Sequence, residues 1–206
     1  MIALFFLFIN PEMLVHPPLL AHGHARQVLV IGDDSPLPEV SRHRTLERVI
    51  TAKEPIALQK EGDHQYDVIL CNCAPLNGPT FYKECLRLLK SDGILVVQNN
   101  ASQTEQIVKI FRDCTPFFRE QRLYLAGTTS FSWVSNDPSY FHVGKRLLES
   151  RLKQNVEGAL KYYTPSIHQA AFALPAYLEQ ALKSSLHKKK TLGKHEQATV
   201  NFTNPA

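Results

Sequence analysis

Four short apolar runs constrain the fold of this chain more than any other feature. They cover Gln27 to Ile31, Arg48 to Thr51, Tyr66 to Asn72 and Gly93 to Gln98. Each run is apolar at consecutive positions rather than at every second one, which is typical of strands buried on both faces of a parallel sheet. We therefore expect these segments to form the centre of a parallel β-sheet.

Segments with helical spacing lie between and after these runs. FYKECLRLLK, Phe81 to Lys90, repeats apolar residues at helical intervals, and Asp92-Gly93 is a turn signal before the next strand. The other expected elements are a helix from Gln103 to Arg112, an antiparallel pair of strands at Arg122 to Ala126 and Thr129 to Val134, and helices at about Tyr140 to Gln154 and Pro175 to Leu186.

This alternation of strands and helices predicts an α/β fold, with a doubly wound, mostly parallel Rossmann-like sheet covered by helices on both faces. Ligands of such sheets bind outside the carboxyl ends of the strands, near the switch in strand order. The strand ends at Gly32, Thr51, Asn72 and Gln98 are therefore where we expect chemistry.

Composition favours one soluble domain. The 206 residues are 44% hydrophobic and 20% charged, enough to build a single buried core. We expect residues 1–186 to form that domain and residues 187–206 to be a basic, disordered tail, not a nucleic-acid-binding element. The opening run IALFFLFI is too short to span a bilayer and has no basic residue before it, so we expect a cytoplasmic protein without a membrane segment.

The cysteines and histidines do not predict a metal site. The four cysteines lack the paired spacing of a structural zinc site, so we expect reduced thiols. His16, His22 and His24 lie close together in the sequence, but no acid or cysteine accompanies them. A metal site needs further ligands, so none is expected here.

Several segments together resemble the polyamine aminopropyltransferases, the spermidine synthase family. The most specific is KYYTPSIHQAAFALPAYL, Lys161 to Leu178, which is similar to the family's C-terminal signature. NPEMLVHPPLLAHGHARQVLVIG, YDVILCNCAP, NGPTFYKECLRLLKSDGILVVQN and TSFSW resemble family segments in the same order. The resemblance implies a sheet of the S-adenosylmethionine-dependent methyltransferase type, in a shortened chain without the family's N-terminal β domain.

The resemblance also implies a reaction and the residues that should perform it. Family members transfer an aminopropyl group from decarboxylated S-adenosylmethionine, a co-substrate rather than a tightly bound cofactor, to putrescine. Their catalytic acids follow the fourth strand as Asp, Ser or Cys, any residue, Asp, Pro. The matching stretch here is Asn72, Cys73, Ala74, Pro75 and Leu76. An amide cannot accept the proton of a diamine, so Asn72 occupies the catalytic position without the catalytic group.

The donor loop also departs from the family pattern, in which three glycines let the backbone approach the adenosyl group. Here Gly32 is followed by Asp33 and Asp34, and two prolines stiffen the turn. We expect Gly32, Asp33 and Asp34 to mark what remains of the donor site, and either aspartate is a candidate replacement for the missing base.

After Thr51 the chain lacks a segment that would hold a helix, a strand and the acid that reads adenine in the family. Two alignments place Glu54 either at the ribose-binding acid or at the adenine-reading acids, and both stay open. An exposed loop acid is the alternative. Glu54 is therefore the third candidate donor-site carboxylate.

On the acceptor side, three residues match family positions. Tyr124 matches a diamine-contacting tyrosine, Gln98 a glutamine at the end of the fifth strand, and Glu12 lies in a matching segment. A rim tyrosine in a sheet and a strand-end amide are the structural alternatives for Tyr124 and Gln98. We expect the Tyr163 and His168 of the signature to fix packing rather than to take part in chemistry.

Three functional hypotheses follow. The chain is an aminopropyltransferase-like enzyme with residual activity on a putrescine-like diamine, or a catalytically silent homologue, or a relic without function. The silent homologue would act as a binding or regulatory subunit of an active relative. We expect an oligomer, formed either with itself or with that relative.

Overall fold

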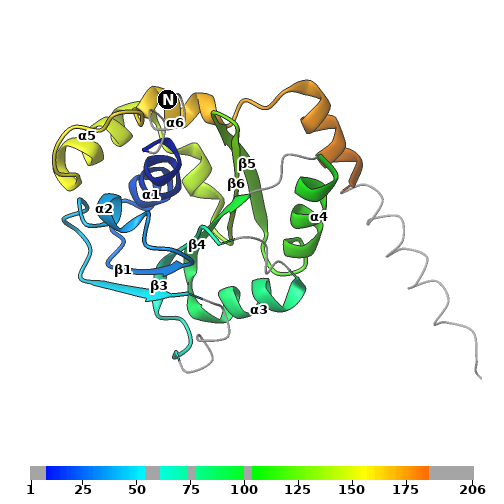
Figure 1. The fold of residues 1–206 in the computed structure, drawn as a ribbon, viewed down its shortest axis with the longest axis horizontal. Helices are drawn as coiled ribbons and strands as arrows, with labels where there is room; N and C mark the ends of the chain where they lie inside the picture. Colours follow the sequence, from blue (N-terminus) through cyan, green and yellow to red (C-terminus); the bar gives the residue numbers. More distant parts are fainter. Residues whose placement is uncertain (1–7, 54–60, 74–77, 100–103, 186–206) are drawn as a thin grey trace, which may run out of the picture.

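The computed structural model describes residues 8–53, 61–73, 78–99 and 104–185. Six strands form one sheet in the order β2-β1-β3-β4-β6-β5, with helices on both faces (Figure 1). The first four strands are parallel, whereas β6 is antiparallel to both β4 and β5. The strands are β1 Gln27–Ile31, β2 Arg48–Ala52, β3 Tyr66–Cys71, β4 Leu89–Asn99, β5 Glu120–Ala126 and β6 Thr129–Ser135. The predicted α/β fold is confirmed.

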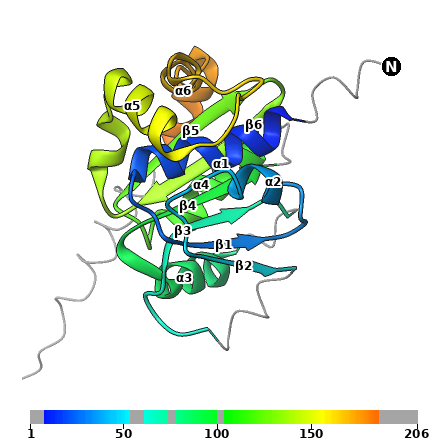
Figure 2. The ribbon, with the colours of Figure 1, turned by 90° about the vertical axis from the view of Figure 1, so that its left-hand side faces the viewer.

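The helices divide between the two faces (Figure 2). Helix α1 lies on one face with α2, η3, α5 and α6, while α3 and α4 lie on the other. The elements are α1 Ile9–His22, α2 Leu37–Val40, α3 Pro79–Leu88, α4 Thr104–Cys114, the short 3₁₀ helix η3 Pro138–His142, α5 Lys145–Asn155, α6 Pro165–Ala171 and an unlabelled helix over residues 176–185. No helix in these parts of the chain has the length and apolar character needed to cross a bilayer.

The apolar strands are filled from both sides, as a doubly covered parallel sheet requires. In β1, Val28 and Val30 belong to the apolar layer under α1, whereas Leu29 and Ile31 pack with α3 on the opposite face. Successive side chains of a strand point to opposite faces, so a strand with helices on both sides must be apolar at every position.

Helix α1 is the longest of the helices that the sequence pattern did not predict, the others being the short α2 and α6. Nearly all of its residues are buried, so it has no polar face and no amphipathic periodicity. It also contains Pro17 and Pro18, which lack the backbone N–H that a helix interior uses and normally argue against a helix.

Two predicted elements differ from the structure in burial or in continuity. Strand β2 was expected to be buried, but it is the edge strand and most of its residues are exposed, as Arg48 and Thr51 would favour. The helix expected from Tyr140 to Gln154 is divided into η3 and α5, because Gly144 lies in extended backbone between them and acts as the N-cap of α5.

Strand β4 begins earlier than expected, with a bulge where the turn was predicted. Tyr66 of β3 lies opposite Leu89, but Val68 lies opposite Ile94, so the residues from Lys90 to Gly93 loop out of register. Asp67 holds this end of the sheet together. One of its oxygens accepts a hydrogen bond from Lys90 Nζ at 2.7 Å, and the other accepts from the backbone N–H groups of Arg26 and Gln27 at the start of β1.

Candidate functional site

The loop after β1 requires a glycine. Gly32 has φ +125°, a conformation that L side chains rarely adopt, and its N–H donates to Ala52 O at 2.8 Å. A Cβ at this position would lie 2.0 Å from Asn72 Oδ1, because Asn72 at the end of β3 packs directly against the loop. The structure thus brings the predicted donor loop and the predicted catalytic position into contact.

Both the oxygen and the nitrogen of the Asn72 side-chain amide form hydrogen bonds with this loop. Its Oδ1 accepts a hydrogen bond from the Asp33 backbone N–H at 3.0 Å. Its Nδ2 donates to Asp33 Oδ1 at 2.6 Å and to Ser35 Oγ at 3.0 Å. Asn72 is only 8% exposed, so these contacts satisfy a buried polar group. Asn72 therefore ties the loop to the sheet rather than offering a base to a ligand.

Asp33 is the carboxylate closest to the catalytic position. The hydroxyl and backbone N–H of Ser35 donate to it and lower its pKa, and Asn72 adds a smaller contribution in the same direction. A carboxylate whose charged form is stabilised in this way is a weaker base than an ordinary aspartate. Asp34 is exposed, and Glu54 lies outside the described residues.

Two thiols at the same strand end were not expected to be chemically distinctive. Cys71 Sγ and Cys73 Sγ are 3.3 Å apart, and all four cysteines are free. A hydrogen bond from Cys71 lowers the pKa of the half-buried Cys73 thiol to about 7, while that hydrogen bond and burial raise the pKa of Cys71. Cys73 is therefore partly a thiolate near neutral pH.

The acceptor-side residues lie at one level of the sheet but in different environments. Gln98 and Tyr124 both lie opposite Phe131, one from each neighbouring strand. Gln98 is half-buried at the end of β4. Tyr124 is fully buried, stacks on Phe131 with ring centroids 4.9 Å apart, and donates to Met13 O at 2.7 Å. Burial raises its pKa well above the ordinary value.

Glu12 joins α1 to the C-terminal signature. Its buried carboxylate accepts backbone hydrogen bonds from Lys161, Tyr162 and Tyr163 at 2.8, 2.9 and 2.7 Å. The Tyr163 hydroxyl lies 3.0 Å from His168 Nδ1. These contacts fix the signature segment against α1.

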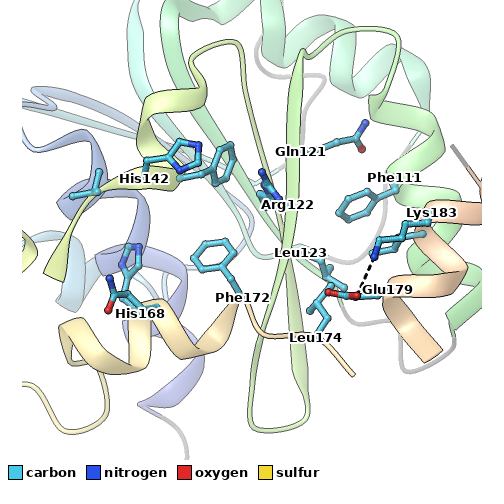
Figure 3. Close-up of a pocket in the computed structure, with 14 residues that line it drawn as sticks. Phe111, Gln121, Arg122, Leu123, His142, His168, Phe172, Leu174, Glu179 and Lys183 are labelled. Atoms are coloured by element: carbon cyan, nitrogen blue, oxygen red, sulfur yellow. Dashed lines mark hydrogen bonds and ion pairs between the residues drawn. The ribbon is translucent and has the colours of Figure 1, made fainter. Parts of the chain in front are cut away.

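A cleft of about 440 Å³ lies along β5, and it contains none of the expected site residues (Figure 3). His168 of α6 and Phe172, which follows that helix, line it on one side of the strand, and Phe111 of α4 lines it on the other. Glu179 and Lys183 form an ion pair of 3.1 Å across one turn of the helix at residues 176–185. The cleft borders Gln121 to Leu123 of β5, which is separated from β3 and its strand-end Asn72 by β4 and β6.

Comparison with known proteins gives a consistent set of relatives. A polyamine aminopropyltransferase of Klebsiella pneumoniae is 31% identical over 227 residues, covering 86% of this chain and 79% of the relative. One from Shigella sonnei is 30% identical over 228 residues, covering 86% and 78%. No family model matches the chain. The chain belongs to the polyamine aminopropyltransferase family.

Solved structures agree with the fold of this family. The spermidine synthase of Thermotoga maritima superposes with a TM-score of 0.74 at 22% identity, covering 85% of this chain and 75% of that one. A spermidine synthase in complex with the transition state analogue AdoDATO has the same TM-score at 21% identity. The predicted family and its fold are confirmed.

The alignment with the aminopropyltransferases also bears on the chain's internal length. The aligned region with the Klebsiella relative spans 227 positions, more than the 206 residues of this chain. The relative therefore has residues within the aligned region that this chain lacks. Strand β2 is the edge of the sheet in this structure, next to the point where a missing segment was predicted.

Proposed function

We propose that this protein is a spermidine synthase-like member of the aminopropyltransferase family in which aminopropyl transfer is weak or lost. The observation that carries the proposal is the closed hydrogen-bond network of Asn72. The family reaction needs a group that removes a proton from a cationic diamine. At this strand end the amide has no proton-accepting capacity, and all of its polar atoms already have partners.

The donor side of the site supports the same conclusion. Space beside Gly32, which in a glycine-rich loop would admit a ligand, is taken by the Asn72 side chain. Asp33 uses one carboxylate oxygen to bind Asn72 and Ser35. The described residues therefore do not fit an adenosyl sulfonium at this loop, and decarboxylated S-adenosylmethionine remains the co-substrate by family resemblance only.

On the acceptor side, two of three expected contacts are used within the protein. The carboxylate of Glu12 binds three backbone N–H groups, and the hydroxyl of Tyr124 binds Met13 O. Neither group is exposed to a diamine. Gln98 is the expected acceptor residue that keeps partial exposure, and an amide alone binds a diammonium chain less strongly than carboxylates do.

The test combines an activity assay with calorimetry. Purified protein is assayed with decarboxylated S-adenosylmethionine and putrescine beside the Klebsiella relative, and spermidine is quantified by mass spectrometry. Loss of the general base alone should lower turnover by about 10²- to 10⁴-fold. Titration with methylthioadenosine and with putrescine should give no heat at micromolar protein. Turnover within tenfold of the relative, or micromolar nucleoside binding, would overturn the proposal.

The second candidate function is a binding or regulatory subunit of an active relative. Strand β2 favours it, because among the described strands β2 pairs only with β1 and leaves one row of backbone groups at the sheet edge. Co-expression with an active aminopropyltransferase, followed by affinity capture of that partner, tests it. A stoichiometric complex that changes the partner's turnover supports this function, and two separate species contradict it.

A further inference from the structure

His22, the last residue of α1, is a buried histidine without a hydrogen-bond partner. It is 1% exposed, and neither ring nitrogen is paired with any of the residues that the structure describes. Burial, with a smaller contribution from His24, lowers its pKa to about 4, so the ring is neutral at physiological pH. A buried polar group without partners is destabilising unless something outside the protein chain satisfies it.

Two further ligand-type side chains meet His22 at the same point. Gly23, with φ +82°, ends α1 in the left-handed conformation and turns the chain back, so that the rings of His22 and His24 lie with centroids 4.4 Å apart. Asp92 comes from the β4 bulge, far away in the sequence. One ligand atom from each of the three residues lies within 4.8 Å of the other two.

We propose that His22, His24 and Asp92 form a binding site for a divalent transition metal of the Zn²⁺ type. Neutral imidazole nitrogens and a carboxylate oxygen are the ligands that such ions prefer, whereas Mg²⁺ and Ca²⁺ favour oxygen ligands alone. Three protein ligands leave a further coordination position for water.

The geometry needs only a small closure around the ion. In a tetrahedral site with bonds of about 2.0 Å, ligand atoms lie roughly 3.3 Å apart. The ligand atoms of His22, His24 and Asp92 lie within 4.8 Å of one another, so they would have to approach somewhat. His24 is exposed and Asp92 is half-buried, so their side chains have room to rotate towards the fixed ring of His22.

Tyr140 and nearby carboxylates support a cation here, and the Arg151 guanidinium that lies beside Gly23 is engaged with Leu20 O and Ala21 O. Tyr140 stacks on His22, with centroids 5.3 Å apart and planes at 16°, and its hydroxyl donates to Asp92 Oδ2 at 3.4 Å. This second contact orients the carboxylate, as groups behind metal ligands usually do. The carboxylates of Asp67 and Asp137 also act on this region, and the positive charge of Lys90 is balanced by its ion pair with Asp67.

The position of the site indicates what a bound ion would do. Helix α1 ends and β4 begins at the amino ends of the parallel strands, opposite the edge that carries Gly32 and Asn72. An ion here would join α1 to the β4 bulge without contacting the strand-end residues. The site therefore does not depend on whether aminopropyl transfer is retained.

The test uses the full-length, untagged protein after removal of metals with EDTA. Zn²⁺ is titrated in competition with a chromophoric chelator, and Co²⁺ binding is followed by visible absorption. We expect one tight site per chain, and Mg²⁺ should not compete. His24→Ala and Asp92→Asn should each weaken Zn²⁺ binding by about tenfold or more, because loss even of groups behind a metal ligand costs 10- to 100-fold. Neither substitution alters the core, since both side chains reach the surface.

Two controls separate this site from others in the chain. His142→Ala removes an exposed histidine outside the cluster and should leave the affinity unchanged. Cys73→Ala removes a thiol that could bind the probe instead, and it should also have no effect. His22→Gln tests the buried ligand, with circular dichroism to verify folding. The proposal is wrong if no stoichiometric Zn²⁺ binds, if the ligand variants bind as wild type does, or if Co²⁺ gives a thiolate charge-transfer band that Cys73→Ala abolishes.

Discussion

Buried polar groups at the carboxyl ends of the parallel strands differ from those at the amino ends in whether they have hydrogen-bond partners. At the carboxyl edge, every polar atom of the Asn72 amide has a protein partner, and the loop from Gly32 to Ser35 is held closed by it. At the amino edge, neither ring nitrogen of the buried His22 has a partner among the described residues. The family would place its chemistry at the carboxyl ends of the strands, whereas the unpaired nitrogens of His22 lie at the amino ends.

This difference shows that the position where the family has its catalytic acid need not be the position where this chain can bind a ligand. Buried polar groups in proteins are almost always satisfied, by the chain or by something bound to it. A fully paired group at a family's catalytic position therefore indicates a structural role, whereas the unpaired His22 supports a ligand because two further ligand-type side chains lie beside it. The following predictions test each side of this contrast.

The largest effect is expected at Gly32. Gly32→Ala introduces a Cβ 2.0 Å from Asn72 Oδ1 in a backbone conformation that alanine rarely adopts. Strain and overpacking together should lower the free energy of unfolding by about 4 kcal/mol. Gly127→Ala is the matched control, because φ is also positive there but no atom lies within 4 Å, so about 1 kcal/mol is expected. Urea unfolding measures both, and equal losses would refute the close contact with Asn72.

Glu12 should give the next largest effect. Glu12→Ala leaves three backbone N–H groups of the signature segment without their acceptor, among them that of the buried Tyr163, which should cost about 3 kcal/mol in unfolding free energy. Glu12→Gln keeps one acceptor oxygen and should lose about half as much. The exposed Glu179 provides the control substitution, with a loss below about 0.5 kcal/mol. A Glu12→Ala variant as stable as the wild type would contradict this structural role and leave Glu12 as a possible diamine contact.

Stability should fall in mild acid because buried histidines remain neutral. Burial lowers the pKa of His168 to about 4 from an ordinary value of 6.5. Between these values the unfolded chain binds a proton that the folded protein excludes, so this contribution is complete above pH 6.5 and is lost as the pH falls towards 4. His168→Gln should reduce the slope of unfolding free energy against pH by about 1.4 kcal/mol per unit, in EDTA. An unchanged slope would show that His168 takes up a proton in the folded state.

The smallest of these effects is expected from restoring an acid at the family's catalytic position. Asn72→Asp places a carboxylate against Asp33 Oδ1, where the amide nitrogen now lies at 2.6 Å. Repulsion should cost roughly 1 to 2 kcal/mol at pH 7. It also raises the carboxyl pKa values in the folded state, so the penalty should disappear as the pH falls below about 4. Adding Asp33→Asn should rescue stability, and a neutral or stabilising Asn72→Asp would show that the loop is open.

The sequence predicted the sheet well and the surrounding helices less well. The apolar runs located β1, β3 and β4 because strands covered on both faces are apolar at every position. The same rule overestimated the burial of β2, which among the described strands pairs with β1 alone. The sequence did not predict helix α1, because this helix is buried on nearly all sides and contains Pro17 and Pro18. Periodicity reveals a helix only when one of its faces meets water.

Residues of the candidate sites show the same limit. That Asn72 cannot act as a base follows from its chemistry, and the sequence was sufficient for it. The absence of an acid near the clustered histidines was also inferred from sequence, and that premise was wrong. Asp92 reaches His22 and His24 through the β4 bulge, and Glu39 Oε2 lies 3.0 Å from His16 Nε2. Both acids are distant in the sequence, so spacing could not reveal them.

The sequence by itself determined the family, the α/β sheet and the replacement of the catalytic acid, because each depends on residue identity or on local periodicity. Only the tertiary structure decided that Asn72 closes the loop after β1 and that Glu12 and Tyr124 have partners within the protein. It also decided that His22 has no hydrogen-bond partner in the part of the chain that the structure describes. The physical reason is that a buried polar group is satisfied by segments that are distant in the sequence, and a local sequence pattern does not specify which of these segments come into contact.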